Sequence, residues 1–170
     1  MKRTIVYIVL ILAAFLLQSS VFSFFALAGI LPNLLIILTA SIALIRGRSE
    51  GCVVGFFCGL LMDITAGSYL GVNALIFLVI GYLLGFLHQI YYEEDITLPL
   101  ILIGLADLIY GVSTYCLTFL IRGRFHFLYY LLHIILPELV YTVIVAIVAY
   151  RLILFICKKL DRKGSVSFID

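Results

Sequence analysis

The sequence predicts an all-α integral membrane protein with six transmembrane helices. Of its 170 residues, 65% are hydrophobic and only 12% are charged, and the mean hydropathy is +1.29. Soluble globular domains are about 45–50% apolar and about 25% charged. Apolar segments fill almost the whole chain, and about 20 such residues are enough to cross a bilayer core. This composition excludes a soluble domain, and the net charge of +2 gives no indication of nucleic-acid binding.

One transmembrane domain is expected over residues 1–157, followed by a short basic cytoplasmic tail at 158–170. Its six segments are about 4–25, 30–45, 51–66, 71–90, 97–121 and 129–157. The first is too long for a signal peptide, whose apolar region takes about 7–15 residues, so it is expected to stay uncleaved. Pro32 and Pro99 fall near the starts of the second and fifth segments, where proline fits a helix. Pro137 predicts a kink in the sixth.

Segment 51–66 is short, because a helix of that length covers only about 24 Å of a core about 30 Å thick. It is either a full crossing or a re-entrant hairpin. Basic residues gather on the cytoplasmic side of bacterial membrane proteins, and six crossings place only Arg122 and Arg124 outside. Five crossings would put the basic tail outside. The predicted protein is therefore a multi-pass membrane protein with both termini cytoplasmic. The inside residues are then Lys2, Arg3, Arg46, Arg48, Arg151, Lys158, Lys159, Arg162 and Lys163.

Glycines recur at four-residue intervals in the third segment and again in the fourth. A row at this spacing follows one face of a helix and lets two membrane helices approach until their backbones touch. This face could pack against either of two partners: the neighbouring helix of the same chain, or a helix of another protein. The residues of this candidate interface are Gly51, Gly55, Gly59, Gly67, Gly71, Gly81 and Gly85.

Three acids, Asp63, Asp107 and Glu138, are expected near the middle of the bilayer, with Asn33 and Asn73 as further intramembrane polar residues. Asp in this position costs about 2.5–3.5 kcal/mol on insertion scales. Because no Lys or Arg shares their depth, the acids must be protonated, hydrogen-bonded, hydrated or paired with another protein. An internal hydrogen-bond network and a site for a proton, substrate or partner helix both fit. For Asp63, a neutral carboxyl that donates and accepts is favoured, which predicts that Asp63→Asn is tolerated.

No residue pattern indicates catalysis, a metal or a cofactor. The four cysteines form no CxxC pair and have no histidine at a metal-site spacing, so they are expected to be packing residues. His88, His126 and His133 have no ligand or nucleophile as a partner at a suitable spacing. Nucleotide-binding and hydrolase motifs are absent from the sequence. We therefore expect a protein that is not an enzyme and has no cofactor.

The order of four short motifs resembles a known family. Residues 31–35 read LPNLL, residues 55–63 read GFFCGLLMD, residues 71–74 read GVNA and residues 81–85 read GYLLG. This order is similar to that of the bacterial rod shape-determining protein MreD family. The hydropathy layout agrees over the whole length, and the most specific stretch is 31–85.

The resemblance implies a non-catalytic scaffold of the cell-elongation complex in the bacterial inner membrane, which supports peptidoglycan synthesis and cell shape. The partners it implies are a bitopic MreC-type protein, the actin-like MreB filament, a SEDS-type glycosyltransferase and a class B penicillin-binding protein. The family's fold is similar to the substrate-binding component of energy-coupling factor transporters. That similarity supplies the alternative function, a vitamin-binding transporter component. Short outer loops with few polar residues favour the scaffold.

Overall fold

The computed structural model describes residues 2–21, 31–66, 71–90, 96–117 and 127–165, and every element in these ranges is helical. This confirms the all-α class. The long helices are α1 (Lys2–Leu16), α3 (Leu34–Arg46), α4 (Arg48–Ala66), α5 (Val72–Phe86), α6 (Thr97–Tyr115) and α8 (Leu136–Ser165). The shorter elements are the π-helical turns η1 (Leu17–Val21) and η4 (Leu131–Ile135), the 3-10 turn η2 (Leu87–Ile90) and the four-residue α7 (Phe127–Tyr130).

Four helical stretches are long and apolar enough to cross a membrane: Arg3–Ser20, Val72–Gln89, Thr97–Tyr115 and Leu131–Leu160. The protein is therefore a membrane protein by length and composition of its helices. Helix α3 is equally apolar but has only 13 residues. Helix α4 has 19 residues but carries Arg48, Glu50 and Asp63.

Two helices extend beyond the apolar segments that predicted them. Helix α4 begins at Arg48, and α8 continues through the basic segment to Ser165. Charged residues at a helix end leave the backbone hydrogen bonds intact. Hydropathy alone therefore predicts these two helices to be shorter than they are. Only Gly47 separates α3 from α4, and its φ of +90° lies in the left-handed region that favours glycine.

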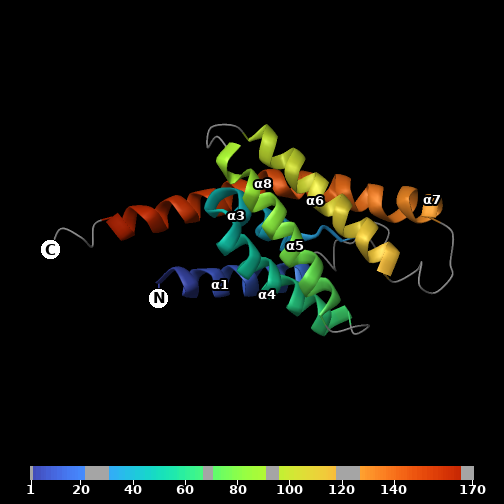
Figure 1. Cartoon of the computed structure of the whole chain (residues 1–170), viewed down its shortest axis with the longest axis horizontal. Coiled ribbons are helices and arrows are strands. Elements are labelled where there is room, and N and C mark those ends of the chain that lie inside the picture. The colour runs from blue at the N-terminus through green and yellow to red at the C-terminus, as the bar shows by residue number, and fades with distance from the viewer. Residues whose placement is uncertain (1, 22–30, 67–70, 91–95, 118–126, 166–170) are drawn as a thin grey trace.

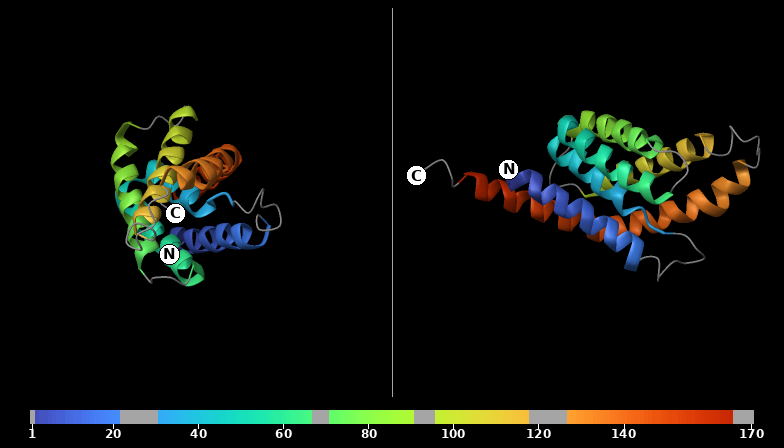
Figure 2. Two further views of the ribbon diagram at one scale, coloured as in Figure 1. Left: turned by 90° about the vertical axis from the view of Figure 1, so that its right-hand side faces the viewer. Right: turned by 90° about the horizontal axis from the view of Figure 1, so that it is seen from below.

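Helix α3 lies at the centre of the molecule. It contacts α1, α4, α5, α6 and α8, and Figures 1 and 2 show it enclosed by these helices. All of its side chains from Leu34 to Leu44 are buried. A helix that is apolar all round is expected at such a position. The hydrophobic core of the protein is therefore built around the shortest of the long helices.

One end of the bundle is fastened by polar contacts between helices. Tyr7 of α1 donates a hydrogen bond to Glu50 of α4. The Arg46 guanidinium donates to the carbonyl oxygen of Cys157 in α8 at 3.2 Å. His88 Nδ1 donates to the carbonyl oxygen of Leu44 at 2.6 Å. The start of α1 and the end of α8 accordingly lie at the same end of the molecule (Figures 1 and 2).

The last helix is irregular where Pro137 was expected to kink it. The π-helical turn η4 ends two residues before Pro137, and α8 begins at Leu136. Proline lacks the N–H that the preceding turn would use, and its ring crowds that turn. A π-helical turn is one way for a helix to absorb such a defect.

Candidate functional site: a glycine interface and buried polar groups

Helices α4 and α5 pack as an antiparallel pair in direct backbone contact. A Cβ built at Gly55 would lie 2.5 Å from the Phe77 carbonyl oxygen. A Cβ at Gly59 would lie 2.5 Å from the Ala74 Cα, and one at Gly85 would lie 2.5 Å from the Arg48 Cα. Such distances are too short for a real side-chain carbon. Any larger residue at these positions must push the two helices apart.

The same face continues toward α3. A Cβ at Gly51 would meet the Cβ of Ala43 at 2.6 Å, and one at Gly81 would meet the Gly51 backbone, with its carbonyl carbon at 2.7 Å. The structure thus brings five of the predicted glycines into contacts within the chain. Gly71 differs: nothing lies within 4 Å of its Cβ position, and its φ of +99° shows a conformational role at the start of α5. Gly67 lies outside the described residues.

The carboxyl of Asp63 caps the first turn of α5. Its Oδ2 accepts hydrogen bonds from the N–H groups of Gly71 at 2.9 Å and Ala74 at 3.0 Å. Its Oδ1 accepts from the N–H of Asn73 at 3.0 Å. The first N–H groups of a helix have no partner within the helix, and a negative charge is favourable at this end. Asp63 therefore joins the end of α4 to the start of α5.

Both oxygens of Asp63 act as acceptors, which suits an ionised carboxylate with no proton to donate. The side chain is only 2% exposed, so water does not share in this interaction. The geometry predicts that Asp63→Asn is tolerated less well than the sequence suggests, because an amide has one acceptor oxygen where the carboxylate has two. These local backbone donors offset the cost of burying the Asp63 carboxylate.

A second group of polar residues links α3, α6 and α8. The backbone N–H of Asn33 donates to the Thr142 hydroxyl at 3.2 Å, and Asp107 also has a hydrogen bond with Thr142. Asn33 Oδ1 caps α3 by accepting from the N–H of Ile36 at 3.3 Å. Asn33, Asp107 and Thr142 are all buried. Thr142 is thus the residue that connects two of the predicted intramembrane groups.

The remaining predicted polar residues extend this network. The Tyr110 hydroxyl of α6 donates to Asn73 Oδ1 of α5 at 3.3 Å. Glu138 of α8 lies near Asp107 and Tyr110. Asn73 also supplies the backbone N–H that Asp63 binds. All five predicted polar residues therefore lie in one region that crosses from α4 through α5 and α6 to α8 and α3.

A model of the rod shape-determining protein MreD family matches residues 1–160 of the chain. The chain belongs to the MreD family. No curated protein and no solved structure matches the chain. MreD proteins determine rod shape and are not a known enzyme family. Among the described residues of this MreD protein, no group of three or more His, Cys, Asp or Glu side chains could hold a metal ion.

Sequence reasoning missed two kinds of residue in this MreD protein. Thr142 was only one of several hydroxyl residues at a suitable depth, and nothing in its spacing distinguishes it. The contacts of Tyr7, Arg46 and His88 at the end of the bundle were also missed. Their partners are 43, 111 and 44 residues away in the chain. Sequence patterns within one helix cannot report such pairs.

Proposed function

We propose that this protein is a non-catalytic scaffold in the inner membrane of a bacterium. In this role it supports peptidoglycan synthesis and cell shape by binding a bitopic MreC-type protein. The wider assembly contains actin-like MreB, a SEDS-type glycosyltransferase and a class B penicillin-binding protein. The observation that carries the proposal is the MreD family match over residues 1–160. A role in rod-shape determination follows from the family, and the scaffold mechanism and its partners are the proposal.

The interior of the protein supports a scaffold. Asp63 binds backbone N–H groups, and the glycines of α4 and α5 contact backbone of the same chain. Polar and small residues of this kind fix helix positions. Meanwhile large apolar side chains cover the outer surfaces of α1, α5 and α8. A rigid interior with an apolar exterior suits a protein that presents a fixed surface to partner helices within the bilayer.

We further propose six crossings with both termini in the cytoplasm. This topology treats α3 and α4 as crossings in addition to the four longer apolar stretches. The contacts of Tyr7, Arg46 and His88 support it, because they join the start of α1, the junction of α3 with α4, the end of α5 and the end of α8. In a six-crossing chain, all four of these places belong to the cytoplasmic side. Arg3, Arg46, Arg48 and Lys158 lie there too, in agreement with the positive-inside rule.

The transporter alternative needs a polar cavity that opens to the outside. The hydrogen bonds described above join Asp63, Asn33 and Thr142 to the backbone and Tyr110 to Asn73. The comparisons with solved structures give the transporter fold no support. We therefore keep the scaffold as the proposed function.

The experiment that tests the scaffold is co-purification from the native host. A tagged chain is purified in mild detergent while the native copy is depleted, and the MreC-type protein is measured by blot together with cell shape. We expect the wild-type chain to retain this partner and to keep cells rod-shaped. Gly59→Leu should lose both, whereas Leu75→Ile, a change on the exposed face of α5, should lose neither. Rod-shaped cells in which the purified chain carries no MreC-type protein would contradict the proposal.

A further inference from the structure

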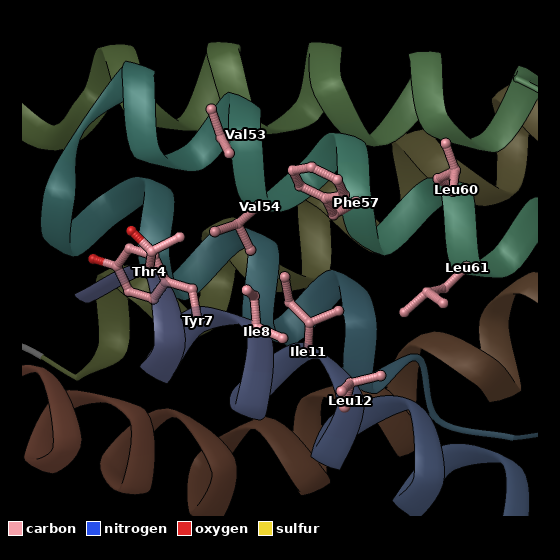
Figure 3. A pocket seen from close by; sticks show the side chains of 10 residues that line it. All are labelled: Thr4, Tyr7, Ile8, Ile11, Leu12, Val53, Val54, Phe57, Leu60 and Leu61. Carbon is pink, nitrogen blue, oxygen red and sulfur yellow. The ribbon is translucent and has the colours of Figure 1, made fainter. Parts of the chain in front are cut away.

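An apolar groove runs between α1 and α4 on the outside of the bundle. Its volume is about 320 Å³. Figure 3 shows Ile8, Ile11 and Leu12 of α1 on one side and Val53, Phe57 and Leu61 of α4 on the other. Among the described residues of the lining, the polar side chains are Thr4 and Tyr7, and both lie at the same end of the groove. The groove is therefore apolar along most of its length and polar at one end.

The groove stays open because α1 is held at both of its ends. At the polar end, Tyr7 donates a hydrogen bond to Glu50 of α4. At the other end, Gln18 Oε1 accepts from the N–H of Leu35 at 3.3 Å, and Gln18 Nε2 lies 3.8 Å from the Met62 sulfur. Between these contacts the side chains of the two helices leave the groove of about 320 Å³. In a bilayer, an apolar gap of this kind is stabilised when hydrocarbon fills it, since an empty gap forfeits van der Waals contacts.

We propose that this groove binds one acyl chain of an anionic phospholipid, with the headgroup at the end where α1 and α4 begin. The dimensions favour a single chain. Residues 4–12 of α1 extend over about 12 Å, so a volume of 320 Å³ corresponds to a cross-section of roughly 27 Å². A helix about 10 Å across has a cross-section of roughly 80 Å². The groove is too narrow for a helix and close in width to one extended hydrocarbon chain.

The charges at the polar end favour an anionic headgroup. Arg3 precedes Thr4 on α1 and is exposed. Arg46 lies near enough to Tyr7 for its charge to affect the phenol oxygen, and Arg46 also reaches the backbone of α8 just before Lys158. Glu50 is the acid on this side of the groove. Cations near the end of an apolar groove are complementary to a lipid phosphate, and anionic lipids concentrate basic segments at the membrane surface.

The test is lipid retention. The full chain is reconstituted in nanodiscs of phosphatidylcholine mixed with phosphatidylglycerol and then released into detergent, and bound lipid is counted by native mass spectrometry. We expect phosphatidylglycerol to be retained in preference to phosphatidylcholine. Val53→Phe and Ile8→Phe each place a larger side chain in the groove from opposite walls, and both positions are about half exposed (55% and 52%), so the fold should tolerate them. Each should reduce retained phosphatidylglycerol by about tenfold or more, equivalent to about 1.4 kcal/mol.

Leu75→Phe is the matched control, because Leu75 is 64% exposed on α5 and does not line the groove. It should retain lipid like the wild type, and Arg3→Gln should reduce the preference for phosphatidylglycerol. Equal retention by Val53→Phe and the wild type would overturn the proposal, as would equal retention of the two lipids. A photo-crosslinker at position 53 that captures a protein in native membranes, and no lipid, would overturn it in favour of a partner segment. The inference does not depend on the scaffold function.

Discussion

Replacing Asp63 with Asn tests whether the cap of α5 needs a carboxylate. The Asp63 oxygens accept three backbone N–H groups, from Gly71, Asn73 and Ala74. An Asn side chain has one acceptor oxygen. It can keep the bonds to Gly71 and Ala74 on one side, but its NH₂ group then faces the N–H of Asn73. We therefore expect Asp63→Asn to destabilise the fold, in contrast to the tolerance that the sequence alone predicts.

The magnitude follows from the groups left unpaired. A buried N–H without a partner costs about 1–3 kcal/mol, and losing a negative charge at a helix N-terminus costs about 0.3–1 kcal/mol more. The expected loss for Asp63→Asn is thus about 1–4 kcal/mol. Asp63→Ala leaves all three N–H groups without the side-chain acceptor and should lose more than Asp63→Asn. Against a total stability of about 5–15 kcal/mol, either loss is measurable.

The assay is thermal unfolding in detergent, followed with a thiol-reactive dye. The exposed Cys116 and the half-buried Cys52 are first replaced with serine in every variant. Cys58 and Cys157 are buried, so their reaction with the dye then reports unfolding. Thr65→Val serves as the control, because the exposed Thr65 hydroxyl donates to carbonyls of its own helix, those of Leu61 and Met62. Asp63→Asn within about 0.5 kcal/mol of the wild type, with Thr65→Val unchanged, would refute the carboxylate cap and return the argument to a neutral acid.

Three further predictions follow from contacts elsewhere. Gly59→Leu should prevent the protein from accumulating in membranes, because its side chain would overlap the Ala74 backbone. A blot of membrane fractions measures this, and Leu75→Ile on the exposed face should accumulate normally. Normal accumulation of Gly59→Leu would contradict the packing argument. Thr142→Val keeps the side-chain shape but removes the acceptor of the Asn33 N–H. It should lower the stability by about 1–3 kcal/mol, measured by the same dye assay. An unchanged midpoint of thermal unfolding would show that this hydrogen bond contributes nothing. In a cysteine-free background, a cysteine at Tyr129 should react with an impermeant maleimide on intact cells and one at Lys159 only after permeabilisation; the reverse pattern would refute the six-crossing topology.

The all-α class could be predicted because composition and segment length both depend on the chain alone. The ends of the helices could not. Helix α4 includes Arg48 and Glu50, and α8 continues beyond Cys157, since backbone hydrogen bonds continue where hydropathy falls. Hydropathy measures the solvent that a segment prefers, whereas a helix ends where its backbone bonds end.

The glycine spacing identified a face that could pack closely, but it left open which helix would lie against it. Only the antiparallel approach of α5 places Ala74 over Gly59 and Phe77 over Gly55. The role of Asp63 was harder to foresee. Its partners are N–H groups of the backbone, which every residue except proline carries, so no side-chain pattern reveals them. The partners of Thr142 are the Asn33 backbone before α3 and the Asp107 side chain of α6, and no pattern within α8 reveals either.

The burial of α3 has a consequence for how the chain enters the membrane. At about 1.5 Å per residue its 13 residues extend over about 20 Å. In the finished bundle its side chains contact neighbouring helices and not lipid. During synthesis it emerges before α4, α5, α6 and α8, which later surround it. Its hydroxyl groups find their hydrogen-bond acceptors within the same helix. Thr39 and Ser41 donate to the carbonyls of Leu35 and Ile37 one turn back, at 2.8 and 2.6 Å. The nascent helix can therefore enter hydrocarbon with these side chains already satisfied, and the later helices need only displace lipid from around it.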